Sequence, residues 1–321
     1  MNQPLEQEAS IPEDAAGERL DRVLAGLFPD YSRSRLQQWL KSGAITVNDA
    51  SQQPRYRVQG GERVRLQAAP EPDAPSVAPE PIELDVIHED DDILVLNKPA
   101  GLVVHPGAGN PDGTLQNALL HRHPHLEAIP RSGIVHRIDK DTSGLMVVAL
   151  SDRAHTVLTA QLQDKTVGRE YDALVAGTFT AGGTVDAPIG RHPRDRKRMA
   201  VVAQGRPAVS HYRIGERFSA HTLLRVFLET GRTHQIRVHM AYIQHPLVGD
   251  PVYGLRQRLP KGADDTVRAA LGGLRRQALH AARLVLQHPA TEETLSWDVP
   301  RPPDMEEVMN VLRAHDRRID A

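Results

Sequence analysis

The chain has 321 residues, of which 40% are hydrophobic and 25% are charged, and its formal net charge at pH 7 is −2. This length allows two domains with cores of their own, and the absence of cysteine excludes disulfides, thiolate chemistry and cysteine-type zinc sites. A reducing cytoplasm suits such a chain, and no apolar run is long enough for a signal peptide or a membrane span. We therefore expect a cytoplasmic protein that binds no membrane.

Charge is distributed unevenly along the chain. Residues 1–17 contain four acidic and no basic side chains, and we expect an acidic flexible tail there. Residues 18–67 contain nine Lys or Arg against five acids, and residues 188–213 contain seven against one. Because local patches attract phosphate even when the total charge cancels, these two segments either contact nucleic acid or are ordinary solvated surfaces.

Residues 18–67 have the pattern of a small module of two helices and two strands. Leu20 and Leu24 share one face of the first helix, and Gly43 ends the second. Two alternating segments, ITVN and ERVRLQ, predict short strands. This order resembles the S4 RNA-binding domain, although a small module with a solvated basic face would give a similar pattern. If the resemblance holds, the RNA-binding side chains are those on or beside the second helix: Arg33, Arg35 and Lys41.

A linker is predicted over residues 68–81, AAPEPDAPSVAPEP, because prolines at this density support neither a helix interior nor a strand. Such a stretch behaves as a semi-stiff spacer. It separates the module from a body that spans residues 82–321.

The body mixes strand and helix patterns. We predict two strands around an acidic turn over residues 86–99 and an amphipathic helix over 153–165. A further strand is predicted over 168–179, and a strand, a turn and a helix over 222–254. Residues 97–107, NKPAGLVVHPG, are punctuated by Pro and Gly and predict a shaped loop. These patterns predict an α+β fold, with a mixed, mostly antiparallel β-sheet and flanking helices around a central cleft, and they leave the strand order open.

Residues 134–150, IVHRIDKDTSGLMVVAL, place a charged turn between two apolar segments that read as strands. A buried carboxylate is costly unless it is paired, so either Asp139 has a cationic partner or this region is a surface turn. Arg137 would share a face with Asp139 in an extended chain. An ionised carboxylate at a strand end can act as a nucleophile or a base, and it can equally be a capping residue beside an arginine.

Two further segments and one aromatic side chain are candidates for the same site. Residues 228–239, LETGRTHQIRVH, gather cations beside a glycine turn, and Arg237 would keep Asp139 ionised if the two side chains met; the alternative is a surface hairpin. Tyr171 either stacks on a nucleobase or packs in the core. The basic loop 191–199 has the composition of an RNA backbone clamp, with these cations: Arg194, Arg196, Lys197 and Arg198.

No pattern for a metal or a nucleotide cofactor is present in the sequence. There is no HExxH pattern, and HRHPH at residues 121–125 does not build a rigid helical pair of ligands. The glycines of residues 97–113 form neither a phosphate-binding loop nor a dinucleotide fingerprint, and no serine lies in a GxSxG elbow. We therefore expect no metal and no cofactor.

In their order, the segments NKPAGLVVHPG, HRIDKDTSGL, REY and GRTHQIRVH, followed by HPLVGDPVYG, resemble the pseudouridine synthases of the ribosomal large-subunit type. The resemblance runs from about residue 82 to the C-terminus. It implies that Asp139 is the catalytic carboxylate and Arg237 its ion-pair partner. Tyr171 would pack on the target base, and the resemblance leaves open whether it also removes the C5 proton. Arg137 would occupy the space that the flipped base leaves in the RNA, and Leu228 would pack under the site.

The resemblance also implies what the protein acts on. The expected activity is that of an isomerase that acts on 23S rRNA or a precursor of the large ribosomal subunit without a cofactor. We expect the enzyme to be a monomer. The tracts VVHPGAGNPDGTLQNALL and GTVDAPIGRHP are most similar to family members that modify the helix 69 stem-loop. Three alternatives stay open: other uridines of 23S rRNA as targets, a non-catalytic ribosome-assembly factor, and a metal-dependent hydrolase.

Overall fold

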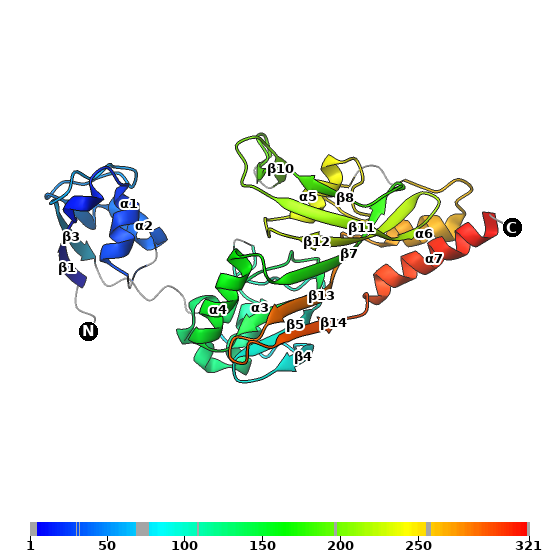
Figure 1. Ribbon diagram of the computed structural model, residues 1–321, viewed down its shortest axis with the longest axis horizontal. Helices are drawn as coiled ribbons and strands as arrows, with labels where there is room; N and C mark the ends of the chain where they lie inside the picture. Colours follow the sequence, from blue (N-terminus) through cyan, green and yellow to red (C-terminus); the bar gives the residue numbers. More distant parts are fainter. Residues whose placement is uncertain are drawn as a thin grey trace. The chain divides into compact units, whose positions relative to one another are not determined.

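The structure of the protein is a computed structural model. It describes residues 5–29, 31, 33–68, 77–107, 109–195, 198–254 and 258–319, with the backbone alone at residues 33 and 34. The chain forms two compact units, residues 1–76 and 77–321 (Figure 1). Each unit has its own hydrophobic core, and each is described by itself.

Unit 1 combines two helices with a three-stranded antiparallel sheet. Its elements are β1 (Leu5–Ser10), the 3-10 helix η1 (Glu13–Ala15), α1 (Leu20–Leu27), α2 (Arg33–Ser42), β2 (Ile45–Val47) and β3 (Arg63–Ala68), with strand order β1-β3-β2. Leu20 and Leu24, which the sequence places on one face of the first helix, are fully buried, and so is Leu36 of α2. Gly43 follows α2 with a φ of 79°, a conformation that glycine adopts readily, and it ends the helix as predicted.

The first strand corrects the prediction of a flexible tail over residues 1–17. Residues 5–10 form β1, which pairs antiparallel with β3 along its whole length. The guanidinium of Arg65 on β3 lies 2.9 Å from the carboxylate of Glu6 and 3.6 Å from that of Glu8. The acidic side chains that suggested a free tail therefore pair with basic side chains of the neighbouring strand.

The predicted linker is shorter than the sequence suggested. Residues 77–81 are attached to unit 2, because the Asn117 side-chain amide donates to the Ala78 carbonyl at 2.8 Å and the Glu80 N–H donates to the Asn117 carbonyl at 3.0 Å. The Glu80 carboxylate also accepts from the N–H of Gly113. At the other end of the predicted linker, Ala68 is the last residue of β3, and residues 69–76 lie outside the described residues.

Unit 2 is built on a nine-stranded mixed sheet with strand order β4-β5-β6-β13-β7-β12-β11-β8 and β14 paired with β13. The described pairs are antiparallel except β6 with β13. The predicted α+β class is confirmed. The strands are β4 (Val86–Glu89), β5 (Ile93–Lys98), β6 (Ser143–Ala149), β7 (Gly168–Ala176), β8 (Gly183–Asp186), β11 (Val209–Arg217), β12 (His221–Leu228), β13 (Leu279–Gln287) and β14 (Thr294–Asp298), and β9 (Ile189–Arg191) forms a separate hairpin with β10 (Met199–Val201).

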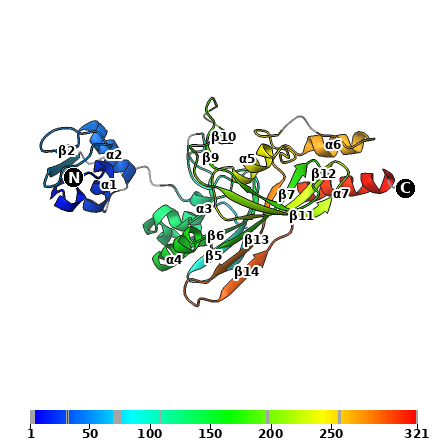
Figure 2. The same ribbon diagram turned by 45° about the horizontal axis from the view of Figure 1, so that its top comes forward.

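Helices pack against both halves of this sheet. They are α3 (Leu115–Arg122), α4 (Asp152–Gln163), α5 (Gln235–Tyr242), α6 (Asp265–Gly273) and α7 (Pro303–Ile319), with the 3-10 helices η2 (Pro124–Ala128) and η3 (Pro130–Gly133). Along β5, Leu94 packs in the same core as α3 and Val95 in the same core as α4, because successive strand residues point to opposite faces. α6 and α7 pack beside β7 and β12 (Figures 1 and 2). None of the described helices has the length and apolar character that crossing a lipid bilayer requires.

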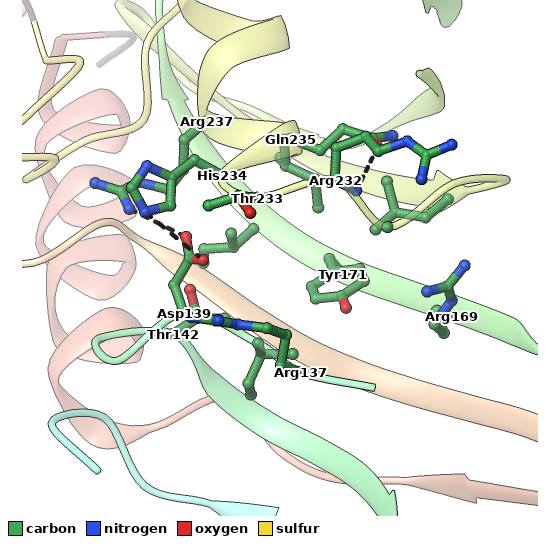
Figure 3. A pocket seen from close by; sticks show the side chains of 15 residues that line it. Arg137, Asp139, Thr142, Arg169, Tyr171, Arg232, Thr233, His234, Gln235 and Arg237 are labelled. Carbon is green, nitrogen blue, oxygen red and sulfur yellow. Dashed lines mark hydrogen bonds and ion pairs between the residues drawn. The ribbon is translucent and has the colours of Figure 1, made fainter. Parts of the chain in front are cut away.

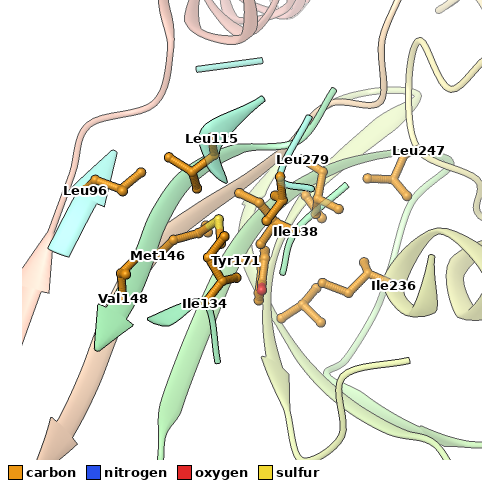
Figure 4. Close-up of a cluster of buried hydrophobic side chains, with 14 of the residues drawn as sticks. Leu96, Leu115, Ile134, Ile138, Met146, Val148, Tyr171, Ile236, Leu247 and Leu279 are labelled. Atoms are coloured by element: carbon orange, nitrogen blue, oxygen red, sulfur yellow. The ribbon is translucent and has the colours of Figure 1, made fainter. Parts of the chain in front are cut away.

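The main core of unit 2 lies under the segment that carries Asp139 (Figure 4). Ile138, Tyr171, Ile236 and Leu279 belong to this core, although they come from four separate parts of the chain. They also line the pocket described below. A close-packed floor of this kind resists rearrangement, so it fixes the positions of the polar side chains above it.

The charged segment differs from the prediction of two strands around a turn. Only the part after it is a strand, β6, whereas Ile134 before it makes a single bridge to Val148. Gly144 near the start of β6 has a φ of 114°, and a side chain there would clash with the backbone of Ala281 on β13. Glycine at this position therefore allows β6 to pair closely with β13, and Asp139 lies in the irregular loop that leads into it.

Candidate active site

A pocket lies between the loop before β6, strand β7 and the segment that joins β12 to α5 (Figure 3). The residues that line it include five that the sequence analysis singled out: Arg137, Asp139, Tyr171, Leu228 and Arg237. Asp139 and Arg237 alone are separated by 98 positions in the chain, so the pocket is a product of the fold.

Asp139 is held by an arginine that is itself held by a second carboxylate. Nη1 of Arg237 donates to Oδ2 of Asp139 at 3.0 Å, while its Nε and Nη2 donate to the two oxygens of Asp250 at 2.7 and 3.0 Å. The Asp250 side chain is fully buried and also accepts from the backbone N–H groups of Val252 and Tyr253. Bidentate pairing fixes the plane of a guanidinium, so Asp250 aims Arg237 at Asp139.

The charges of this network support one another. Burial works to lower the pKa of Arg237, but hydrogen bonds and charge from Asp250 and Asp139 outweigh it and raise that pKa above its ordinary value. Burial works to raise the pKa of Asp250, but the hydrogen bonds and charge of Arg237 hold it below its ordinary value. Both groups are therefore ionised near neutral pH.

The loop that carries Asp139 is fastened by a buried lysine. Nζ of Lys98 donates to the carbonyls of Pro99, Leu102 and Lys140 at 2.7, 2.9 and 2.9 Å. The N–H of Gly101 donates to the same Lys140 carbonyl at 2.9 Å. The NKPAG segment was predicted as a shaped loop without a role, and its position shows that it clamps the residue next to Asp139.

A histidine and a tyrosine complete the Asp139 end of the pocket. The Tyr253 hydroxyl accepts from the N–H of Met199 at 2.9 Å and lies 2.8 Å from Nδ1 of His234. Which of these two groups donates depends on the tautomer of the imidazole ring, whose other nitrogen is Nε2. This Nε2 lies 3.9 Å from Oδ1 of Asp139. Burial lowers the pKa of His234, which favours the neutral ring.

Tyr171 lies in the middle of the pocket on β7. Its side chain is 6% exposed and packs in the main core (Figures 3 and 4). Among the described residues its hydroxyl has no hydrogen-bond partner. Burial raises the pKa of Tyr171, so the hydroxyl stays protonated in the free protein. The ring therefore offers an apolar wall whose polar atom remains available to a ligand.

Comparison with known proteins gives one consistent picture. Residues 92–242 match the family model of the RNA pseudouridylate synthases, and residues 18–64 match that of the S4 domain. The ribosomal large subunit pseudouridine synthase D of Xanthomonas campestris pv. campestris is 55% identical over 312 residues, which cover 97% of this chain and 94% of that protein. Its namesake from Escherichia coli (strain K12) is 53% identical over 315 residues, 98% of this chain and 96% of the relative.

The chain belongs to the RNA pseudouridine synthase family. It is therefore an enzyme, an isomerase. The solved structure of human RNA pseudouridylate synthase domain containing 4 is similar to this fold, with a TM-score of 0.55 and 26% identity over 71% of this chain and 92% of that one. Human RNA pseudouridylate synthase domain containing 1 gives a TM-score of 0.53 and 25% identity over 72% and 95%.

The predicted site residues occupy different parts of this synthase pocket. Asp139 and Arg237 are in contact, and Tyr171 lines the same pocket. Arg137 is exposed at the rim, where it also borders a second pocket. Leu228 contributes an apolar wall. Their roles in catalysis stay predictions, since geometry alone does not assign them.

The basic residues predicted to bind RNA are described only in part. In unit 1, Lys41 is exposed, and the guanidinium of Arg35 lies 4.9 Å from the centre of the Trp39 ring. The side chain of Arg33 lies outside the described residues. In the loop 191–199, Arg194 is exposed, whereas Arg198 lies 5.3 Å from the centre of the Tyr253 ring. Arg196 and Lys197 lie outside the described residues.

Three residues of the pocket region received no role from the sequence. Asp250 and Tyr253 lie in the segment HPLVGDPVYG, which was quoted only for its resemblance. Arg169 precedes Tyr171 by two positions on β7, and strand alternation alone would have placed both side chains on one face. In the part of the chain that the structure describes, no group of three or more His, Asp or Glu side chains is arranged to hold a metal ion.

Proposed function

We propose that this enzyme converts uridines of 23S rRNA to pseudouridine in the large ribosomal subunit or its precursor, with the helix 69 stem-loop as its main target. It acts in the cytoplasm, as a monomer and without a cofactor. The observation that carries the proposal is the Asp139–Arg237–Asp250 network beside Tyr171 in one pocket. The names of the relatives support the ribosomal substrate, and the S4 unit supplies a second RNA-binding surface.

The proposed reaction begins with extraction of the target uridine from its stack. Unstacking costs a few kcal/mol, and a loop RNA reduces that cost because its bases are less constrained. The base would enter the pocket and pack on Tyr171. Arg137 at the rim would occupy the gap that the base leaves in the RNA. Closure of RNA over the pocket would exclude water, which strengthens the electrostatic field of Asp139.

Asp139 would act as the nucleophile on the flipped nucleotide. The N1–C1′ bond breaks, the uracil turns, and a C5–C1′ bond forms; the C5 hydrogen leaves as a proton and N1 gains one. The product is an isomer of the substrate, so no oxidant, reductant or water is consumed. Arg237 keeps the carboxylate ionised and oriented, and Asp250 keeps Arg237 in place.

Substitution of the proposed nucleophile tests the activity. Asp139→Asn keeps the size of the side chain and removes its charge, so pseudouridine formation on rRNA should fall below detection while RNA binding persists. Asp298→Asn changes an exposed carboxylate on β14 and should behave like the wild type. Normal turnover by the Asp139→Asn protein would exclude the proposed chemistry.

Chemical mapping of pseudouridine in rRNA from cells that lack the gene tests the target. We expect the helix 69 modifications to disappear, to return with the wild-type gene and to stay absent with Asp139→Asn. Loss of modification at other uridines of 23S rRNA would show that those uridines are the target instead. Normal modification together with a defect in subunit assembly would favour a non-catalytic assembly factor.

A further inference from the structure

A second pocket adjoins the first and is strongly basic. It shares a wall with the first pocket, formed by Arg137, Arg169, Gly231 and Arg232. Its cationic lining consists of Arg131, Arg137, Lys165, Arg169, Arg206 and Arg232. The acidic residue in this lining, Glu229, is already bound by Lys165 at 2.8 Å and by His211 at 2.7 Å. The remaining cations therefore face one another without a nearby anion in the described structure.

Arg169 on β7 is the least compensated of these cations. Its side chain is only 9% exposed, and its Nε is buried without a hydrogen-bond partner. Among the described residues, no carboxylate pairs with it. Its Nη1 lies 2.9 Å from the point where a Cβ on Gly231 would be, so the guanidinium is packed against the glycine turn. A buried charge without a partner is costly, and natural proteins rarely keep one without a use.

Two further side chains that line this pocket are affected by burial and by the charges of neighbouring arginines. Burial lowers the pKa of Arg232, and the charge of Arg206 lowers it further. Burial also lowers the pKa of His105, with further lowering by the charges of Arg137 and Arg131. Nε2 of His105 is a second buried polar atom without a partner in this pocket. An anion placed here would relieve the repulsion and satisfy Nε of Arg169.

We propose that the second pocket binds a backbone phosphate of the RNA, the phosphodiester next to the target uridine, with Arg169 as its central ligand. Figure 3 shows Arg169 on the far side of Tyr171 from Asp139 and Arg237. A uridine whose base packs on Tyr171 would lie between Asp139 and Arg169, and the backbone on one side of it would run along the wall that the two pockets share. A phosphodiester supplies the charge and the several acceptor oxygens that a guanidinium fork binds.

This proposal rests on the proposed function, because it takes the RNA substrate as given. It adds a specific contact to the general attraction of basic patches for RNA. A charge that serves only folding and a charge that binds substrate differ in one measurable way: the first supports stability when no RNA is present, and the second costs stability until the RNA arrives.

Replacement of Arg169 in the full-length chain separates these two cases. Arg169→Met keeps an unbranched side chain and removes the unpaired charge, so the melting temperature should stay unchanged or rise. Affinity for a stem-loop RNA that the wild type modifies should fall roughly 10-fold or more, and the slope of log affinity against log salt should decrease by about 0.7. Arg169→Lys should restore part of the affinity. Arg268→Met, at an exposed position on α6, controls for general loss of charge and should match the wild type.

Single neutral linkages in the RNA test the specific contact. A methylphosphonate, which lacks the phosphate charge, is placed at one linkage at a time around the target uridine. For the wild type, one flanking linkage should weaken binding when neutralised. For Arg169→Met, neutralisation of that same linkage should have no further effect, whereas linkages elsewhere should still matter.

The outcomes distinguish failure of this inference from failure of the proposed function. If the wild type forms pseudouridine but Arg169→Met binds RNA with unchanged affinity and salt slope, or loses thermal stability, the phosphate site is wrong and the activity stands. The same conclusion follows if every neutral linkage weakens RNA binding by Arg169→Met as much as it weakens binding by the wild type. If the wild type forms no pseudouridine on any rRNA, the proposed function itself fails.

Discussion

The two ends of the active-site pocket contain the same kind of side chain in opposite electrostatic states. At one end, Arg237 makes three hydrogen bonds to two carboxylates, and its charge is fully compensated by Asp139 and Asp250. At the other end, Arg169 is also buried and has no carboxylate partner among the described residues. The fold therefore completes the charge pairing at the Arg237 end by itself, and we call this the closed end. It leaves the charge at the Arg169 end, the open end, for a ligand to complete.

The largest effect should follow from opening the closed end. Asp250→Asn keeps the shape of the side chain but removes the charge that compensates Arg237. Breaking one partner of a buried ion pair typically costs about 3–5 kcal/mol, and the remaining contact with Asp139 should keep the loss near the lower limit. Pseudouridine formation should also fall, because Arg237 is no longer aimed at Asp139. Urea unfolding and single-turnover assays measure the two effects.

A pair of the same geometry whose carboxylate is exposed provides the control. Arg276 binds Asp304 through two hydrogen bonds of 2.6 and 2.7 Å, but the Asp304 side chain is 46% exposed. Asp304→Asn should therefore cost less than about 1 kcal/mol. Similar losses for Asp250→Asn and Asp304→Asn would show that burial does not distinguish the two pairs, and the contrast between the pocket ends would lose its physical basis.

His136 reports on the open end through its pKa. Burial and the charge of Arg169 lower this pKa from 6.5 to about 3, and Nε2 of His136 accepts from the N–H of Val147 at 3.0 Å. The neutral ring of the folded protein is favoured above pH 6.5, and this contribution to stability is lost as pH falls towards 3, because the unfolded chain takes up the proton first. The slope should stay below about 1.4 kcal/mol per pH unit, since the side chain is partly exposed.

Substitution of His136 isolates this slope. His136→Gln can still accept from Val147 and does not titrate, so its stability should fall less than that of the wild type between about pH 6.5 and about pH 5. In Arg169→Met the His136 pKa should rise, as histidine NMR titration would show, because a neighbouring positive charge is gone. A His136 pKa that does not respond to loss of Arg169 would mean that this charge is already neutralised in the free enzyme.

A smaller effect is expected from the Tyr253–His234 hydrogen bond at the closed end. Tyr253→Phe keeps the ring beside Arg237 and removes the hydroxyl that holds the His234 ring in position. A hydrogen bond of this kind contributes about 0.5–1.5 kcal/mol, so the single-turnover rate should fall roughly 2- to 10-fold with little change in RNA affinity. Tyr242→Phe, at an exposed position of α5, is the matched control. Equal loss of rate in both variants would rule out a positioning role for Tyr253.

The sequence predicted one end of the pocket better than the other, for a physical reason. The requirement that a buried carboxylate be paired pointed from Asp139 to Arg237, and the two side chains meet. Arg169 lies on the same strand face as Tyr171, but the sequence does not show that its charge is buried without a partner. Asp250 could not be assigned from pairing rules alone, because its partner Arg237 is already paired with Asp139 in the prediction. The acidic start of the chain does not form the predicted tail, because charge composition does not reveal a complementary strand 53–63 positions away.

The smallest change addresses the open end without altering its charge. A Cβ on Gly231 would lie 2.9 Å from Nη1 of Arg169, which is the far end of a flexible side chain. Gly231→Ala should therefore shift the guanidinium by a few tenths of an ångström at little cost in stability. Because Arg169 keeps its charge, the salt dependence of RNA binding should persist, while affinity falls less than in Arg169→Met. Combining Gly231→Ala with Arg169→Met should add nothing to the loss of affinity, because the displaced group is absent. Fully additive losses would show that Gly231 contacts the RNA in its own right and that the open end is organised by the turn rather than by Arg169.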